Sequence, residues 1–283
     1  MRNQVARVTT RGAWRYQAGL LVFAAVVLMP FYWLVRSSLA EEQQLFSLPL
    51  VYLPRPTLES FRQLSEQIPL LRYIVNSLVF AAGTTLVSLA SSLPAAWAIV
   101  RLQVRGRSVV LWALVLSMAL PPIATILPLY EVLRALRLLD TLPGLILVMS
   151  SALIPFTVWV LVAYLQAIPR DLDEAAVIDG ANLFQLLRYI VIPLAMPALV
   201  TMGLINFIVA WNELLYPLAF SATESSKTMS VAITEIFQAR NPYGRPWNLI
   251  STLGVVMVVP VMAMVALGQR RITSGLTRGG VVG

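Results

Sequence analysis

Six long apolar stretches dominate this sequence and constrain its fold more than any other feature. The first runs for 20 residues, Tyr16 to Val35, without a charge, and a helix of that length crosses about 30 Å of hydrocarbon. Hydrophobic residues make up 58% of the chain and charged residues 12%, more apolar surface than a soluble domain needs. The sequence therefore predicts an all-α polytopic membrane protein with six transmembrane helices, at residues 16–35, 74–100, 108–130, 141–166, 194–216 and 249–267.

The start of the chain allows two interpretations. Four arginines and no acid precede the first apolar run, and Ser38-Leu39-Ala40 resembles a small-residue cleavage site, so this region has features of a signal peptide. The apolar run is longer than a usual signal core, which favours a retained helix. Both interpretations place the N-terminus in the cytoplasm.

The third apolar stretch contains helix-breaking residues. Pro121 and Pro122 stand in its outer half, and Pro128 lies near its end. Each proline removes a backbone donor, and its ring clashes with the preceding turn. We expect this span to be bent or broken in its outer half.

The chain lacks the residue types that most enzyme and metal sites need. It has no His and no Cys, which removes His-based catalytic triads and most metal sites. Lys227 is its only lysine, and a Walker A loop would need glycines where Ser221 and Ser226 stand. No catalytic residues, metal ligands or cofactor are predicted in this chain. If the protein is part of a pump, a partner ATPase binds the ATP and Mg²⁺.

Basic residues are distributed unequally between the two sides of the predicted bundle. The inner segments hold twelve arginines and four acids, whereas the outer segments hold nine basic residues and eight acids. This bias follows the positive-inside rule and places both termini in the cytoplasm. The net charge of +8 therefore indicates topology and contact with anionic membrane lipid, not nucleic acid. The inner segments are 1–15, 101–107, 167–193 and 269–283; the outer ones are 36–73, 131–141 and 217–248.

One inner segment is acidic. Pro169 is followed by Asp171 and two further acids, which is a helix-start signature because acids in a first turn complement the helix dipole. Gly180 then permits a turn, after which a second helix can start. From the charges alone, an ordinary acidic loop between two spans is the other interpretation.

The spacing within this segment is more specific than its charge. Glu-Ala-Ala at residues 174–176, Gly180 and Ile190-Val-Ile-Pro193 resemble the EAA loop of bacterial ABC importer permeases, with Ile192 where that family has Leu. In that family the loop forms a short cytoplasmic coupling helix that docks into a groove on an ATPase. The resemblance implies these docking residues: Asp173, Glu174, Ala175, Ala176, Asp179, Gly180, Ala181, Phe184 and Pro193.

Almost the whole chain resembles the maltose-type permease subunit of carbohydrate ABC importers, including the tail Gly275-Leu-Thr-Arg-Gly279. The resemblance implies the type I permease fold, with a cytoplasmic tail (1–15), a permease domain (16–268) containing the coupling loop (167–193), and a second cytoplasmic tail (269–283). It also implies a multi-pass protein of the bacterial inner membrane. The implied partners are a second related permease, two copies of a cytoplasmic ABC ATPase, an extracytoplasmic solute-binding protein and a small-molecule sugar.

Polar residues within the spans are candidates for a substrate path or gate. The second span has hydroxyl side chains along one helix face, at Ser77, Thr84, Ser88 and Ser91. Packing between helices is the usual reason for such a stripe, and a hydrophilic passage is the alternative. Glu213 is the one charge within a predicted span, and an interfacial position, a structural bond or a gate role would each explain it. Residues 211–216 are similar to a segment common in sugar-importer permeases. The candidates are Asn76, Ser77, Asn206, Trp211, Asn212 and Glu213.

The segment before the last span carries turn signals, including Asn241-Pro-Tyr-Gly244. In the resembled subunit this outer loop reaches into the binding protein, while the sugar pocket in the membrane lies mainly in the other permease. The resemblance therefore implies a position near the delivered sugar for Ser225, Lys227, Thr228, Gln238 and Asn241.

Together these features predict the permease subunit of an ATP-driven, binding-protein-dependent importer of an oligosaccharide or glycoside. The chain would couple ATP hydrolysis by a separate ATPase to alternating access. An importer of the same fold for a polyol or glycerophosphate is the first alternative. An ion-coupled secondary carrier needs ionisable residues near the membrane midplane. The predicted spans contain only one charged residue, Glu213, and it lies away from the midplane. For a membrane-embedded enzyme, the sequence offers no convincing set of catalytic residues.

Overall fold

The computed structural model describes residues 13–49, 51–102, 105–238 and 245–279, with side chains between residues 16 and 266. Within this part of the chain every regular element is helical. Contacts divide the chain into two compact units, Met1–Ile68 with Ile236–Val258 and Pro69–Glu235 with Val259–Gly283. Among the described residues, five helices are long and apolar enough to cross a membrane, or six if one bent pair counts as a single span. The prediction of an all-helical polytopic membrane protein is confirmed.

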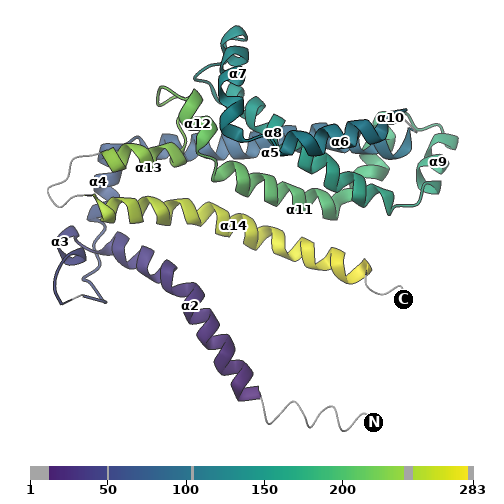
Figure 1. The fold of residues 1–283 in the computed structure, drawn as a ribbon. Helices are drawn as coiled ribbons and strands as arrows, with labels where there is room; N and C mark the ends of the chain where they lie inside the picture. Colours follow the sequence, from purple (N-terminus) through teal and green to yellow (C-terminus); the bar gives the residue numbers. More distant parts are fainter. Residues whose placement is uncertain (1–12, 50, 103–104, 239–244, 280–283) are drawn as a thin grey trace. The chain divides into compact units, whose positions relative to one another are not determined.

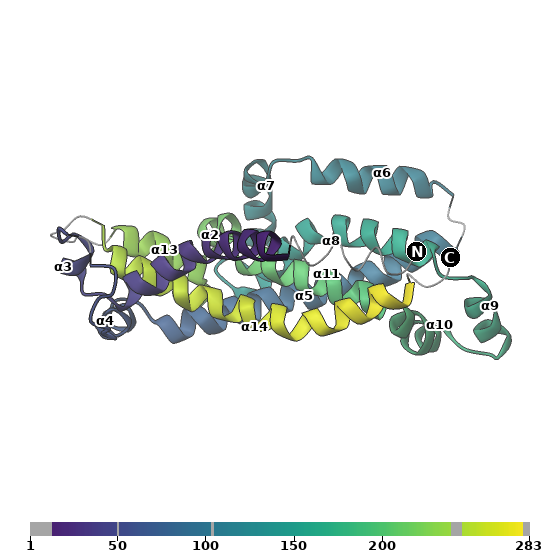
Figure 2. The same ribbon diagram turned by 90° about the horizontal axis from the view of Figure 1, so that it is seen from below.

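Three long helices form the centre of the larger unit: α5 (Leu70–Arg101), α8 (Leu142–Gln166) and α11 (Ile192–Trp211). They lie side by side in both ribbon views (Figures 1 and 2), and α5 packs against the other two. Small residues allow this approach, since a Cβ added at Gly83 of α5 would lie 2.6 Å from Ile146 Cδ1 of α8. Apolar side chains fill the bundle toward both of its ends.

Four of the predicted spans agree closely with the helices. They correspond to Tyr16–Leu39 within α2 (Ala13–Leu39), to α5, to α8, and to Trp247–Ala266 within α14 (Trp247–Gly279). Because α14 continues to Gly279, most of the predicted C-terminal tail (269–283) is helical.

The third span is broken where the prolines predict it. α6 (Arg107–Met118) and α7 (Pro122–Ala135) meet at an angle of 104°. Pro121 adopts an extended conformation with ψ 129°, and Pro122 takes the first helical turn of α7, where its missing N–H is not needed. The break therefore follows directly from the two adjacent prolines.

The fifth span differs from its predicted bounds of 194–216. Its helix starts at α10 (Leu183–Leu186), where Asn182 and Gln185 form a capping box, and passes through a π turn (η1, Leu187–Val191) into α11. Pro193 lacks the N–H that an α-helix would donate to residue 189, and the wider π turn lies at this point. The second half of the predicted coupling loop (167–193) thus belongs to the spanning helix, which ends at Trp211.

The hydroxyl stripe of α5 is mainly a packing surface. Ser77, Thr84 and Ser88 are buried, as expected for contacts between helices. Ser91 is exposed, and Ser92 is buried in its place. The next buried hydroxyl after Ser88 is therefore that of Ser92, four residues on, and not that of Ser91.

The smaller unit contains α2, α3 (Glu42–Leu45), α4 (Glu59–Gln67) and the first part of α14. α2 continues to Leu39, and Ser38 and Ala40 are buried. The chain after α2 returns to it, because Thr57 N donates to the Leu39 carbonyl at 2.9 Å. The retained first helix stays a prediction.

Candidate functional site

The predicted docking segment forms two short helices at an angle, the docking elbow (residues 171–186), beyond the ends of α5 and α8 (Figures 1 and 2). Its first helix is α9 (Asp171–Ile178), with three acids in the first turn. Gly180 ends this helix with φ +81°, a left-handed conformation that glycine adopts without strain. Ala181 N donates to the Ala176 carbonyl at 2.9 Å and Gly180 N to the Val177 carbonyl at 3.0 Å, the two bonds of a Schellman cap.

The docking elbow has two distinct faces. Asp173 and Ala176 are buried against the bundle. Large apolar side chains elsewhere on the elbow are exposed, with Val177 61%, Ile178 85% and Phe184 69% exposed. Of the predicted docking residues, Ala181 is half-buried, and the exposed ones are Glu174, Ala175, Asp179, Gly180, Phe184 and Pro193.

An ion pair joins the elbow to the last residue of α5. Arg101 Nε donates to a carboxylate oxygen of Asp173, and the two side chains are only 9% and 12% exposed. Arg101 Nη2 also donates to the Ile168 carbonyl at 3.0 Å, while Arg170 Nη2 donates to the Val100 carbonyl at 3.3 Å. The two arginines therefore bridge α5 and the start of α9 in both directions.

At the other end of α5, two predicted passage residues hold the outer loop. Asn76 Nδ2 donates to the carbonyls of Glu224 and Lys227 at 3.0 and 2.9 Å. Ser77 Oγ accepts from Met229 N at 2.8 Å. The structure thus brings part of the predicted passage set together with part of the predicted binding-protein loop.

Two charged residues of this outer loop form an ion pair. Lys227 Nζ lies 2.6 Å from Glu235 Oε1, and Tyr73 OH donates to Glu235 Oε2 at 3.2 Å. Glu235 belongs to α13 (Met229–Gln238), so the only lysine of the chain fixes this helix to the loop before it. Sequence inspection does not single out the contact of Tyr73 with Glu235, because the two residues lie 162 positions apart in the chain.

The other predicted loop residues have varied surroundings. Ser225 is exposed, and its hydroxyl lies 2.6 Å from that of Thr223. Thr228 is buried, and Gln238 is exposed at the end of α13. Asn241 lies outside the described residues.

Asp140, which the sequence does not mark as functional, fastens the outer loop to the connection between α7 and α8. Its Oδ1 accepts from Ala222 N, Thr223 N and Ser226 Oγ at 2.9, 3.0 and 2.5 Å, and its Oδ2 from Thr223 Oγ1 at 2.6 Å. Partial burial alone would raise the pKa of Asp140, but hydrogen bonds from Ser226, Thr223 and the backbone outweigh it and lower the pKa to about 2.

Three polar side chains meet in the middle of the bundle. Asn206 Nδ2 of α11 donates to Thr157 Oγ1 of α8 at 3.0 Å and to Ser88 Oγ of α5 at 3.2 Å. All three residues are completely buried. Asn206, a predicted passage residue, therefore has its amide directed between the three helices of this chain.

The remaining predicted passage residues lie where α11 ends. Trp211 is buried and stacks on Phe207 with ring centroids 5.9 Å apart, and Asn212 is exposed. Glu213 is not within the span as predicted, because α11 ends two residues earlier. Its Oε1 accepts from the N–H groups of Leu215 and Tyr216 at 2.8 and 3.2 Å, so it caps the short helix α12 (Leu215–Phe220).

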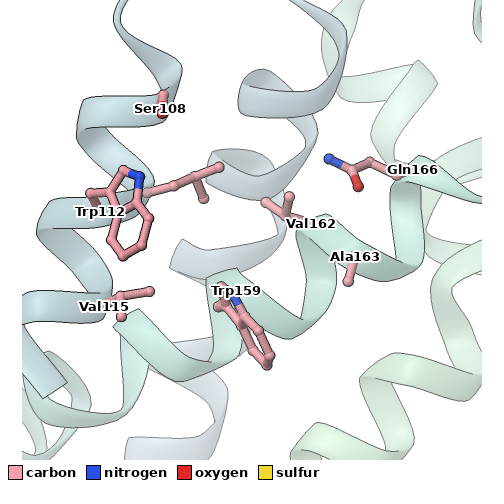
Figure 3. Close-up of a pocket in the computed structure, with 8 residues that line it drawn as sticks. Ser108, Trp112, Val115, Trp159, Val162, Ala163 and Gln166 are labelled. Atoms are coloured by element: carbon pink, nitrogen blue, oxygen red, sulfur yellow. The ribbon is translucent and has the colours of Figure 1, made fainter.

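A cavity of about 340 Å³ lies between α6 and α8, with Trp112 and Trp159 on its walls (Figure 3). Apart from the indoles, its hydrogen-bonding side chains are Ser108 and Gln166. These walls suit an acyl chain or a neighbouring helix better than a sugar, whose hydroxyls need several polar partners. Among the described residues, no group of three His, Cys, Asp or Glu could hold a metal ion.

Comparison with known proteins identifies the fold and the family. The model of the family described as "Binding-protein-dependent transport system inner membrane component" matches residues 85–278, more than half of the chain. The chain belongs to this family. It is therefore the multi-pass inner-membrane permease component of an ABC transport system, which works with a binding protein and leaves ATP to a partner ATPase. Family membership decides against the ion-coupled carrier and the membrane-embedded enzyme.

Two relatives match nearly end to end. The chain is 34% identical to the sulfoquinovosyl glycerol transport system permease protein SmoH of Agrobacterium fabrum, over 90% of this chain and 89% of the relative. It is also 34% identical to the trehalose/maltose transport system permease protein MalG of Thermococcus litoralis, over 94% and 95%. A crystal structure of a bacterial ABC transporter involved in the import of the acidic polysaccharide alginate has the same fold, with a TM-score of 0.79, 22% identity, and 93% and 97% of the two chains covered.

Proposed function

We propose that this permease is one of two related permeases in a sugar importer, and that the solute is an oligosaccharide or a glycoside. The relatives that support this substrate class are named for sulfoquinovosyl glycerol and for trehalose/maltose. An identity of 34% supports a class of solute and not an individual sugar. An importer of the same fold for a polyol or a glycerophosphate is the alternative.

The observation that carries the coupling part of the proposal is the exposed face of the docking elbow. Val177 and Ile178 lie outside every candidate span among the described residues, so water would otherwise contact them. A partner that covers them gains about 25 cal/mol for each Å² of apolar surface buried. Glu174 and Asp179 add negative charge to the exposed elbow. We assign the groove of the partner ATPase as the occupant of this face.

The mechanism follows from this assignment. ATP closes a dimer of two ATPase copies, and the docking elbow of each permease moves with its groove. Rigid attachment of the elbow to the bundle converts this movement into a rotation of the spans that opens the outer face.

Docking at the elbow also determines the orientation in the membrane. An elbow that binds a cytoplasmic ATPase lies on the cytoplasmic side, and the excess of arginine on the same side supports this. Both termini are cytoplasmic only if the chain crosses the membrane an even number of times. The bent pair α6–α7 therefore counts as one span, and the total is six.

The outer loop is the proposed contact of the binding protein. Ser225 and Gln238 are exposed and available for that contact, whereas Lys227 and Thr228 support the loop from inside. At the outer end of α11, the exposed Asn212 is the candidate for contact with the sugar as it leaves the binding protein.

The test is reconstitution with the partner permease, the ATPase and the binding protein in proteoliposomes. The binding protein would be loaded in turn with disaccharides, glycosylglycerols, polyols and glycerophosphates, and ATP hydrolysis would be measured with each. We expect stimulation with a disaccharide or glycoside. Stimulation by polyols or glycerophosphates alone would contradict the substrate class while leaving the transport mechanism intact.

A further inference from the structure

In the larger unit, α5 contacts both the docking elbow and the outer loop. At its C-terminal end Arg101 pairs with Asp173, and at its N-terminal end Tyr73 and Asn76 hold the loop and α13. The helix has 32 residues, which corresponds to a length of roughly 48 Å. It continues as one helix through Pro94. α5 therefore has the position of a lever between the two sides of the membrane.

The attachment of α9 to this lever is mainly polar. α9 has only 8 residues and ends at Gly180, and an isolated helix of this length is not stable by itself. Besides Ala176, its buried residue is Asp173, whose carboxylate is bonded to Arg101. The same guanidinium donates to the Ile168 carbonyl, so one side chain joins α5 to both the start of α9 and the connection that precedes it.

The burial of this pair distinguishes it from the other ion pairs of the described chain. The pairs Arg62–Glu66, Arg72–Glu224 and Arg134–Glu131 have side chains that are more than half exposed, and exposed pairs contribute little to stability. The side chains of the remaining pair, Lys227 and Glu235, are 22% and 31% exposed. Arg101 and Asp173 are largely removed from water, so neither can be displaced without leaving the other charge unpaired in the interior. A joint of this kind resists sliding of α9 along the end of α5.

We propose that the Arg101–Asp173 pair is the joint through which movement of the docking elbow reaches α5 and, through α5, the outer loop. Both are positioning residues, because their charged groups bond to each other and to the connection before α9. This proposal rests on the proposed docking of the ATPase at the elbow. It separates two tasks within the elbow, because the exposed face binds the ATPase and the buried pair transmits its movement.

The experiment measures transport per ATP hydrolysed in proteoliposomes that contain the complete transporter. The variants are Arg101→Gln, Asp173→Asn and the double exchange Arg101→Asp with Asp173→Arg. The matched control is Arg105→Gln, an exposed arginine of the same inner segment. We expect the single variants to retain the ATPase and to hydrolyse ATP, but to import at least tenfold less solute per ATP. The double exchange restores at least a third of the coupling, and the control retains all of it.

A reversible cross-link provides a second measurement that does not depend on charge. The chain has no Cys, so Arg101→Cys with Asp173→Cys introduces a unique pair once the partner chains are free of cysteine. A short bis-methanethiosulfonate reagent forms a disulfide with each of the two thiols and releases methanesulfinate. We expect this cross-link to restore transport per ATP and its reduction to remove the gain. Insertion and ATPase attachment are checked in parallel, so that a folding defect is recognised as such.

The outcomes distinguish this inference from the proposed function. Unchanged transport per ATP in the single variants, or a cross-linked pair that inserts and remains uncoupled, overturns the joint. Loss of ATPase attachment in the single variants also overturns it, because the pair would then serve docking. If Glu174→Lys leaves attachment and transport normal, docking at the elbow itself is wrong, whatever the cross-link shows.

Discussion

The carboxylate of Asp140 accepts a hydrogen bond from the hydroxyl of Thr223 at 2.6 Å, which joins the connection between α7 and α8 to a loop 83 residues further along the chain. The backbone N–H groups of Ala222 and Thr223 donate to the same carboxylate. Asp140 therefore determines the position of the outer loop that is proposed to contact the binding protein.

The first prediction concerns the pH dependence of this loop. The pKa of Asp140 is about 2 in the folded protein, below the value of about 3.9 in an unfolded chain. Because the folded pKa is the lower one, the stabilisation is complete above about pH 4 and is lost as the pH falls toward 2. We expect hydrogen-exchange protection of the Ala222 and Thr223 amides, corrected for intrinsic rates, to fall in this window.

The variant Asp140→Asn is expected to lose about 1 kcal/mol of this protection at neutral pH, roughly fivefold in exchange rate, after allowance for solvent screening. Glu131→Gln is the control, because its pair with Arg134 is exposed. Equal protection at pH 5 and pH 2.5 would contradict the assigned role of Asp140.

The second prediction concerns the buried contact of Asn206 with Ser88 and Thr157. Asn206→Ala removes the two hydrogen bonds that the Asn206 amide nitrogen donates to other helices, and such bonds contribute on average somewhat less than 1 kcal/mol each in a membrane protein. We expect the purified transporter to unfold at a lower SDS fraction, corresponding to a loss of about 1 kcal/mol. Asn212→Ala, which changes an exposed amide, is the control. An equal loss of stability in both variants would show that the buried hydrogen bonds of Asn206 do not contribute to the free energy of unfolding.

Local patterns in the sequence predict much of this structure. The apolar runs give the spanning helices, adjacent prolines give the break between α6 and α7, and Gly180 gives the end of α9. Each of these features depends on residues that are neighbours in the chain. Their conformational preferences can therefore be predicted without knowledge of the fold.

Contacts between remote residues could not be predicted in this way. Asp140 stands in a short, charge-balanced loop, and nothing near it indicates Thr223 or Ser226 as partners. Asp173 belongs to the predicted docking segment, but in the fold its side chain is buried and bonded to Arg101. The sequence predicts a second helix after Gly180 and a fifth span from residue 194. A π turn at residues 187–191 instead joins the two into one helix.

The third prediction separates a helix cap from a gate at Glu213. Glu213→Gln keeps an acceptor for the N–H groups of Leu215 and Tyr216, so we expect uptake to remain above half of the wild-type rate. Glu213→Ala removes the cap and costs about 1 kcal/mol of stability. Uptake of labelled solute and thermal stability are measured for both variants. Loss of uptake in the stable Gln variant would indicate a role for the charge itself, as in a gate.

The fourth prediction compares two glycines that share a backbone conformation. Gly180 and Gly106 have φ values of +81° and +85°, and a Cβ at either position would meet no atom within 4 Å. Substitution by Asp strains the backbone by about 1–2 kcal/mol at both sites. Only Gly180→Asp also alters the docking elbow, so it should reduce ATPase attachment and abolish uptake while the chain remains inserted. Co-purification of the ATPase and solute uptake measure this difference; similar losses in Gly106→Asp would attribute the effect to strain alone.

The last prediction concerns the charge of the exposed elbow face. Glu174→Lys reverses a charge at the proposed contact with the ATPase, whereas the buried Asp173 beside it keeps its bond with Arg101. We expect insertion to be normal, ATPase attachment to weaken at least tenfold, which is about 1.4 kcal/mol, and uptake to be lost. Asp171→Lys reverses an exposed acid in the first turn of the same helix and should weaken attachment much less. If raised salt also weakens ATPase attachment in the wild type, this would support a charge contact, because screening weakens exposed ion pairs. Normal attachment in Glu174→Lys at low salt would remove Glu174 from the docking surface.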